Sequence, residues 1–212
     1  MWLIIIASAL IHIISIKTGP KWLFFATKPI PIIAMIGMLL LSPAIQLPYA
    51  KWIISGLSLS LIGDLVMMYP KDSFTQGIKF FCAALTCYAL GFIQISAWHF
   101  TPWLPFAVLG FGICAYLFFK PDLGKEKWSV ASYIIVLMTM LWMSMEYYAA
   151  GKTQSSAFAV LGSFIFTMSG IVIAFERFGS TSTFSRQVAM ATYYSAQLLI
   201  TMSVSAIVIR FL

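Results

Sequence analysis

Two charged residues of this 212-residue chain stand inside apolar runs long enough to cross a lipid bilayer. Lys28 lies within LFFATKPIPIIAMIGMLLL, and Asp64 lies within WIISGLSLSLIGDLVMMY. A charge at membrane depth costs several kcal/mol unless it is paired or hydrated, so such a residue marks a functional site by default. A carboxyl group beside an ammonium group can donate and accept protons. We therefore predict that Lys28 and Asp64 share one intramembrane pocket and perform acid–base chemistry there.

Further polar side chains fall at the same depth in other apolar runs. With a rise of about 1.5 Å per residue, Lys28 lies roughly 9 Å and Asp64 roughly 8 Å from the same membrane face. The other polar residues near this level are Ser169, Tyr193, Tyr194 and Gln197. Polar groups from four segments are thus expected just beneath one face of the membrane.

Less active roles for the two charges are also consistent with the sequence. Pro29 and Pro31 remove backbone donors inside a span, which is tolerated where the backbone lines a cavity or is buried in protein. Alternatively, Pro29 only begins a helix and Lys28 extends its ammonium to the lipid headgroups. Asp64 could likewise serve only as the structural ion-pair partner of Lys28.

The remaining candidate groups give weaker signals. Glu146 lies near the end of an apolar run, where solvation is the favoured interpretation, and a tilted span would instead bring it to the cavity. His12 and His99 have no partner at metal-ligand spacing and are expected to be structural. We expect no metal and no cofactor. The three cysteines are expected to be packing residues inside spans: Cys82, Cys87 and Cys114.

Composition defines the elements that must position these groups. The chain is 61% hydrophobic and only 9% charged, far from a soluble domain. We predict an all-α, polytopic membrane helix bundle that forms one domain over residues 1–212, with the N-terminal segment as a span, not a signal peptide. Loop residues divide it into eight transmembrane segments: 2–16, 22–42, 51–69, 77–99, 102–119, 128–149, 155–175 and 187–211.

The basic residues give an orientation. Connections on one side hold nine: Lys17, Lys21, Lys71, Lys79, Lys120, Lys125, Lys127, Arg177 and Arg186. The other side holds three: Lys51, Lys152 and Arg210. The positive-inside rule therefore places both termini outside the cytoplasm, and we expect a multi-pass protein of a bacterial inner membrane. Basic residues spread over short loops suit anionic lipid headgroups, and no nucleic-acid partner is expected.

Five sequence blocks together resemble the YhhN family, which contains bacterial membrane proteins and animal lysoplasmalogenases. In chain order they are FFATKPIPII, SLIGDLVMMYP, FTQGIKFFCAALTCYALGF, GSFIFTMSGIVIAFERF and ATYYSAQLLI. The resemblance covers nearly the whole chain. It implies eight spans and hydrolysis of the vinyl ether bond of a lysoplasmalogen, which yields a fatty aldehyde and a glycerophospho-base.

The resemblance also implies site residues. The matching positions are Lys28, Pro29, Gly63, Asp64, Phe74, Gly77, Tyr88, Tyr193, Tyr194, Ala196 and Gln197. We expect Asp64 to be the catalytic acid/base and Lys28 to set its charge or bind the lipid phosphate. The residues expected to contact substrate or orient water are Tyr193, Tyr194, Gln197, Ser169 and Tyr88.

Two positions depart from the family pattern. Leu85 stands where many members have His, and Gly170 follows Ser169 where many have Asp. We expect the partners to be a lysophospholipid substrate and the surrounding membrane lipids. The sequence does not specify the oligomeric state of the protein. The alternatives are a catalytically impaired lipid-binding or scaffold protein, and a small transporter that uses Lys28 and Asp64.

Overall fold

The chain folds as a bundle of helices. The computed structural model describes residues 1–68, 73–97, 99–179 and 182–209, and within them there are helices and no strand. The α-helices are α1 (Trp2–Thr18), α2 (Lys21–Thr27), α3 (Ile30–Leu40), α4 (Pro48–Met67), α5 (Phe74–Ile95), α6 (Leu104–Phe119), α7 (Lys127–Gly151), α8 (Gln154–Phe178) and α9 (Thr183–Ile209). Short 3-10 turns are η1 (Pro43–Gln46), η2 (Lys120–Asp122) and η3 (Gly124–Glu126).

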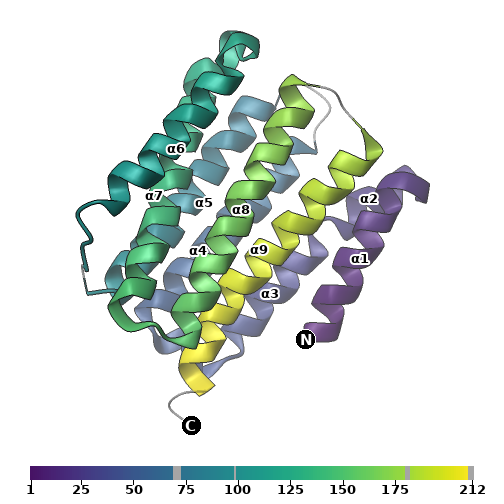
Figure 1. Cartoon of the computed structure of the whole chain (residues 1–212). Helices are drawn as coiled ribbons and strands as arrows, with labels where there is room; N and C mark the ends of the chain where they lie inside the picture. The colour runs from purple at the N-terminus through teal and green to yellow at the C-terminus, as the bar shows by residue number, and fades with distance from the viewer. Residues whose placement is uncertain (69–72, 98, 180–181, 210–212) are drawn as a thin grey trace.

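The predicted all-α, polytopic membrane bundle is confirmed. Each of the eight expected segments corresponds to one helix, or for 22–42 to the pair α2 and α3. Six helical stretches in the described residues are long and apolar enough to cross a membrane, and α1 is a shorter apolar helix. The more polar α9 runs the length of the bundle beside α8 (Figure 1). The expected segment ends at residues 69 and 211 lie outside the described residues.

The helices run up and down, so their connections alternate between two ends. The start of α1 and the end of α9 lie at the same end (Figure 1). The seven basic residues at the opposite end with described side chains are Lys17, Lys79, Lys120, Lys125, Lys127, Arg177 and Arg186. Lys71, which we placed at that end, lies outside the described residues. Orientation relative to the cytoplasm stays a prediction.

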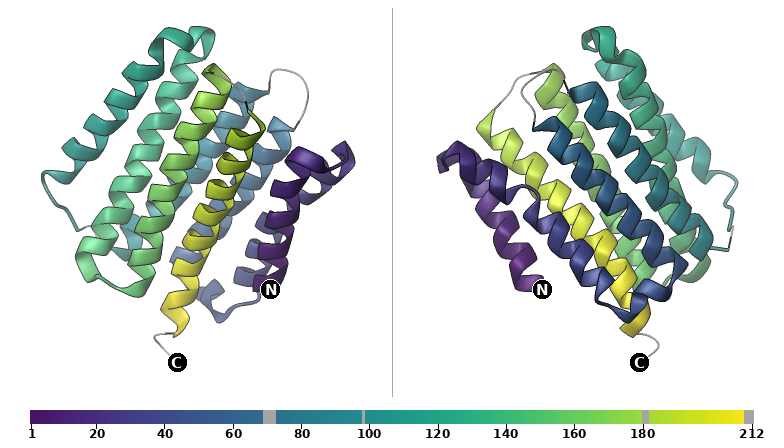
Figure 2. Two further views of the ribbon diagram at one scale, coloured as in Figure 1. Left: turned by 45° about the vertical axis from the view of Figure 1, so that its right-hand side comes forward. Right: turned by 180° about the vertical axis from the view of Figure 1, so that it is seen from behind.

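Helices α4, α5, α7, α8 and α9 form the centre of the bundle, with α6 and α1 at opposite edges (Figure 2). Two glycines bring the central helices close together. A Cβ on Gly56 of α4 would lie 2.2 Å from the Tyr88 ring of α5, and one on Gly162 of α8 would lie 3.1 Å from the Ala196 carbonyl oxygen of α9. Both positions need glycine because a side chain would collide with the neighbouring helix.

The expected single segment 22–42 is interrupted. Helix α2 ends at Thr27 and α3 begins at Ile30, with Lys28 and Pro29 between them. Pro29 and Pro31 lack the backbone N–H groups that a continuous helix would use here. The interruption places Lys28 at a corner of the backbone inside the protein, where its side chain is buried.

Candidate active site

Lys28 and Asp64 meet inside the bundle. Lys28 Nζ lies 3.2 Å from Asp64 Oδ1, and the two side chains are 9% and 4% exposed. The expectation that the two charges share one place is confirmed. Burial of both partners distinguishes this pair from surface salt bridges, because neither ion can be solvated freely.

Two consecutive tyrosines of α9 donate hydrogen bonds to the two residues of this ion pair. The Tyr193 hydroxyl donates to Asp64 Oδ2 at 2.8 Å. The Tyr194 hydroxyl donates to the backbone carbonyl of Lys28 at 3.0 Å. Each Asp64 oxygen therefore has one donor from outside α4, and the helix interruption at Lys28 is fixed to α9.

A second polar cluster lies one helical turn farther into the bundle. Gln197 follows Tyr193 by four residues, and Ser60 precedes Asp64 by four, so each lies on the same helix face as its counterpart. Tyr88 donates to Gln197 Oε1 at 2.7 Å. Gln197 Nε2 and Ser60 Oγ are buried without a hydrogen-bond partner among the described residues. The cluster therefore retains unused hydrogen-bonding capacity beside the ion pair.

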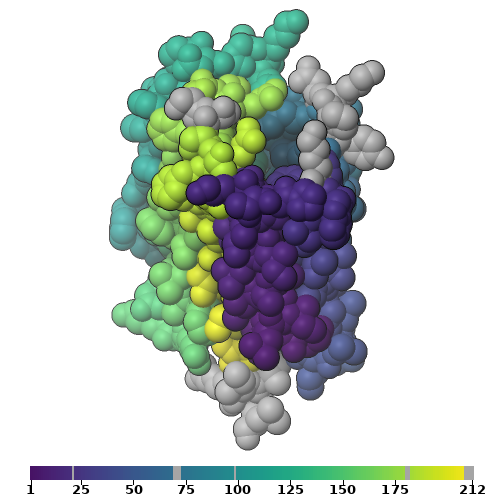
Figure 3. Space-filling model, turned by 90° about the vertical axis from the view of Figure 1, so that its right-hand side faces the viewer, coloured from purple at the N-terminus to yellow at the C-terminus, as the bar shows by residue number. Residues whose placement is uncertain are grey.

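An apolar cavity of about 240 Å³ opens beside the ion pair. Lys28, Asp64 and Tyr193 line it together with side chains such as Ile78 and Phe81. In Figure 3 the surface is hollowed beside the purple corner of α1 and α2, next to the yellow-green start of α9. The arrangement brings one buried acid–base pair to the wall of a space suited to a hydrocarbon chain.

The expected substrate-contacting residues divide into two groups. Tyr193 and Ser169 line the cavity, although the Ser169 hydroxyl donates to the Ala189 carbonyl of α9 at 3.0 Å. Tyr88, Tyr194 and Gln197 lie behind this wall and are not part of the lining. Their expected roles in binding substrate stay predictions, because their observed hydrogen bonds run from Tyr194 to the Lys28 carbonyl and from Tyr88 to Gln197.

The two positions that depart from the family pattern have different surroundings. Gly170 lines the cavity, and a Cβ there would lie 3.3 Å from the Tyr133 hydroxyl. Leu85 is fully buried in the apolar core. Glycine at 170 therefore leaves the cavity wider at this point, while Leu85 contributes packing.

Two charged residues that line the same cavity were missed from the sequence: Arg186 of α9 and Glu176 of α8. Arg186 was counted only as a basic residue near a span end. Its spacing of seven residues from Tyr193 was an available signal, because residues i and i+7 share one face of a helix. Glu176 has the same spacing from Ser169.

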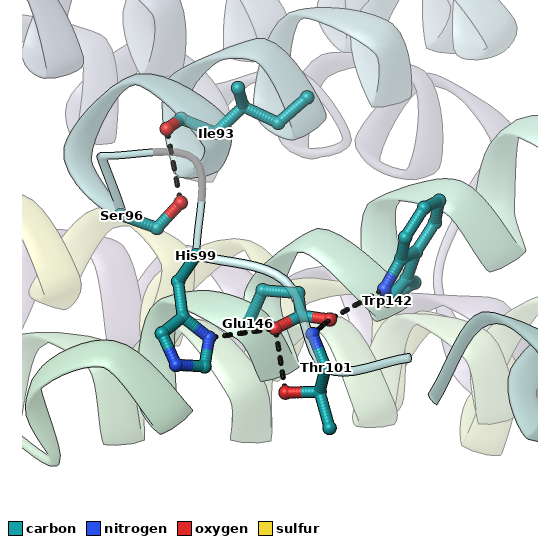
Figure 4. A network of polar contacts seen from close by, with 6 residues as sticks. All are labelled: Ile93, Ser96, His99, Thr101, Trp142 and Glu146. Carbon is teal, nitrogen blue, oxygen red and sulfur yellow. Dashed lines mark hydrogen bonds and ion pairs between the residues drawn. The ribbon is translucent and has the colours of Figure 1, made fainter. Parts of the chain in front are cut away.

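The favoured interpretation of Glu146 as a solvated residue is wrong. Its side chain is 1% exposed, and it does not line the cavity, so the alternative is wrong too. Its carboxylate accepts from the Thr101 backbone N–H at 2.8 Å, the Thr101 hydroxyl at 3.0 Å and Trp142 Nε1 at 2.9 Å, and it lies 2.9 Å from His99 Nδ1 (Figure 4). Glu146 fixes the connection between α5 and α6 to α7.

The other candidate groups have structural surroundings. His12 is buried with Nδ1 3.1 Å from the Thr27 hydroxyl, at the end of α2. Within the described part of the chain, no three His, Cys, Asp or Glu side chains are grouped as a metal site would need. The three cysteines are free thiols: Cys82, Cys87 and Cys114.

Comparison with known proteins gives a consistent family. The family model described as the YhhN family matches residues 23–204. Lysoplasmalogenase TMEM86B of Homo sapiens is 30% identical over 191 residues, covering 86% of this chain and 76% of its own. Lysoplasmalogenase TMEM86B of Sus scrofa is 28% identical, covering 88% and 77%. The Escherichia coli O157:H7 protein named uncharacterized membrane protein YhhN is 22% identical, covering 87% and 88%. No solved structure matches the chain.

Proposed function

Because the chain belongs to the YhhN family, we propose that it is a membrane-bound hydrolase that cleaves the vinyl ether bond of a lysoplasmalogen. The products would be a fatty aldehyde and a glycerophospho-ethanolamine or glycerophospho-choline. Relatives at 28% and 30% identity are named lysoplasmalogenases, which supports this reaction class. The observation that carries the proposal is the cluster of Lys28, Asp64 and Tyr193 in the wall of an apolar cavity.

Vinyl ether hydrolysis needs a proton and a water molecule in succession. A proton first adds to the double-bond carbon farther from the ether oxygen, which leaves an oxocarbenium ion. Water attacks the carbon next to the oxygen and gives up a proton, which replaces the one donated. The hemiacetal then breaks its bond to the glycerol oxygen, which takes the hydroxyl proton as the aldehyde forms. The site must therefore give and regain a proton and hold a water molecule.

Asp64 is the proposed proton donor and acceptor. Lys28 Nζ, 3.2 Å from Oδ1, is close enough to supply a proton to the carboxylate before each turnover. Tyr193 holds the other oxygen at 2.8 Å and so fixes the direction of the carboxyl group. After the proton leaves, the Asp64 carboxylate lies beside the oxocarbenium ion and stabilises its positive charge.

Gln197 Nε2 and Ser60 Oγ are the proposed water-binding groups. Leaving a buried polar group unpaired costs about 1–3 kcal/mol, so this place favours a ligand that fills the missing hydrogen bonds. Both groups lie one helical turn from the Asp64–Tyr193 contact, with Tyr88 fixing the orientation of the Gln197 amide. The apolar lining would contact the hydrocarbon chain of the substrate.

The location of the cavity suggests where the substrate comes from. It opens at the end of the bundle that carries most of the basic side chains. We propose that this end faces the cytoplasm of a bacterial inner membrane and that both termini lie outside. The substrate would then be a lysophospholipid of the inner leaflet.

Aldehyde release from a lysoplasmalogen tests the proposal. Asp64→Asn should lower turnover by about 10²- to 10⁴-fold, the usual contribution of a positioned acid or base. Glu126→Gln is the matched control, because Glu126 pairs with Arg177 at the same end of the bundle but outside the cavity. Gel filtration and thermal unfolding establish that both variants fold. Wild-type turnover in Asp64→Asn would remove Asp64 from the acid role.

A lipid-binding protein without turnover is the second candidate, because Leu85 and Gly170 replace polar residues common in the family. Binding of lysoplasmalogen with no aldehyde release by the wild-type protein would support this candidate. A transporter would instead produce a pH-dependent flux in proteoliposomes without lipid turnover.

A further inference from the structure

The cavity has a second pair of opposite charges, which we call the mouth pair: Arg186 and Glu176. Both residues line the cavity, and both side chains are more exposed than those of Lys28 and Asp64. Arg186 Nε lies 3.6 Å from Glu176 Oε1, and the side chains are 59% and 16% exposed. The proposed reaction uses neither residue, although both face the space in which its substrate would lie.

The mouth pair is aligned with the deep end of the cavity by helix geometry. On α9, Arg186, Met190 and Tyr193 follow the spacing i, i+4, i+7, and all three line the cavity. On α8, Ser169, Ile173 and Glu176 repeat this spacing in the opposite chain direction. Seven residues of helix correspond to about 10 Å, so the mouth pair lies two turns from Ser169 and from Tyr193, the residue that contacts Asp64.

The contacts within the mouth pair leave room for a ligand. At 3.6 Å the Arg186–Glu176 contact is longer than a hydrogen bond, and such partly exposed pairs contribute little to stability. The Arg186 side chain is 59% exposed, so its remaining guanidinium N–H groups are accessible to a ligand. Glu176 also accepts from the Ser185 hydroxyl at 2.8 Å, which orients its carboxylate. A ligand can therefore separate the two charges at small cost if it supplies a new partner for each.

We propose that the mouth pair binds a zwitterionic lysophospholipid headgroup, with Arg186 on the phosphate and Glu176 on the ammonium group. A guanidinium matches phosphate oxygens with paired N–H donors, and the carboxylate pairs with the ammonium in place of Arg186. The glycerol backbone and one phosphoester oxygen separate the phosphate from the ether bond. These few bonds span less than the two helical turns between Arg186 and Tyr193, so the long Arg186 side chain must extend inward along α9 for the ether bond to reach Asp64.

This inference rests on the proposed function for the identity of the lipid, but its test uses binding alone. The probe is a saturated ether lysophospholipid, 1-O-alkyl-glycerophosphoethanolamine, which contains the headgroup and chain but no vinyl bond. The two comparison probes are 1-O-alkylglycerol, which lacks the headgroup, and glycerophosphoethanolamine, which lacks the chain. Affinities are measured for purified protein in micelles of a neutral detergent.

Arg186→Gln should raise the Kd for the ether lysophospholipid about tenfold, as expected for loss of a charge-assisted contact at a partly exposed site. Its Kd for 1-O-alkylglycerol should not change. Lys125→Gln, which removes an exposed positive charge at the same end of the bundle, is the control and should leave both affinities unchanged. A Kd within twofold of wild type for Arg186→Gln would overturn the proposal. Wild-type binding of glycerophosphoethanolamine as tight as that of the lipid would also overturn it, since the ligand would then be a soluble phosphodiester.

Glu176→Gln tests the other half of the headgroup. The variant should bind the ethanolamine lipid more weakly and 1-O-alkyl-glycerol-3-phosphate, which has no ammonium, more tightly than wild type does. An unchanged ratio of these two affinities would remove Glu176 from recognition. Aldehyde release by the same preparations separates the two proposals. Headgroup-dependent binding without turnover contradicts only the proposed reaction, and turnover with binding insensitive to Arg186 contradicts only the headgroup assignment.

Discussion

Replacing Lys28 and Asp64 separately and together should give strongly non-additive losses of stability. The two side chains are buried against each other, and removing one partner of a buried pair costs about 3–5 kcal/mol. Replacing both by apolar residues of similar size is close to neutral. Lys28→Met combined with Asp64→Leu leaves only the Tyr193 hydroxyl without its acceptor, so the double variant should lose about 1–3 kcal/mol, which is less than the loss for Asp64→Leu alone.

The contacts also predict which single variant is the less stable. Asp64→Leu leaves the Lys28 ammonium without an acceptor among the described residues, so the full cost of about 3–5 kcal/mol applies. Lys28→Met leaves Asp64 with the Tyr193 hydrogen bond at 2.8 Å, which retains about 1.5–3 kcal/mol. The loss for Lys28→Met should then be about 2 kcal/mol.

Equilibrium unfolding in detergent micelles measures all three free energies. Adding Tyr193→Phe to Lys28→Met should remove the remaining support of Asp64 and bring its loss to the level of Asp64→Leu. Additive losses in the double variant, or a larger loss for Lys28→Met than for Asp64→Leu, would refute the reasoning. Either result would mean that the two charges are solvated independently.

Two other perturbations test the framework around the site. Glu146→Gln should lower the free energy of unfolding by about 1–2 kcal/mol, because charge-assisted bonds to Thr101 and its neighbours weaken, without changing aldehyde release; unchanged thermal unfolding would contradict this. Gly56→Ala places a methyl group 2.2 Å from the Tyr88 ring, so it should lower the free energy of unfolding by about 1–3 kcal/mol and disturb the contact of Tyr88 with Gln197. Thermal unfolding and aldehyde release should both be reduced. Wild-type values of both would show that α4 and α5 can separate.

The central charges could be predicted because the membrane makes them conspicuous. Lys28 and Asp64 are expensive inside apolar runs, and helix rise gives their depth. Pro29 indicated an irregular backbone because proline lacks the N–H group that a helix interior uses. The contact between Tyr88 and Gln197, which are 109 residues apart in the sequence, depends on the packing of α5 against α9 and has no local signal.

For charged residues near the ends of spans, the sequence predicted the wrong surroundings or did not indicate a place in the cavity. Glu146 was expected in solvent because it lies near a span end, but Thr101 and His99 come from a connection whose path the sequence does not specify. Arg186 was missed because a basic residue at the end of a span is ordinary. In both cases the deciding partners come from other elements, so depth along one helix was insufficient.

The common spacing on α8 and α9 sets a fixed distance along the cavity. Two turns of helix fix the interval between the mouth pair and Tyr193, which holds the buried carboxyl group, whatever the length of the hydrocarbon chain beyond it. For a lipid anchored by its phosphate, substrate specificity would depend on the distance between the headgroup and the reactive bond. It would depend only weakly on the length of the hydrocarbon chain. Inserting one residue into α9 between Arg186 and Tyr193 would rotate these two residues by about 100° relative to each other. They would then no longer face the same cavity.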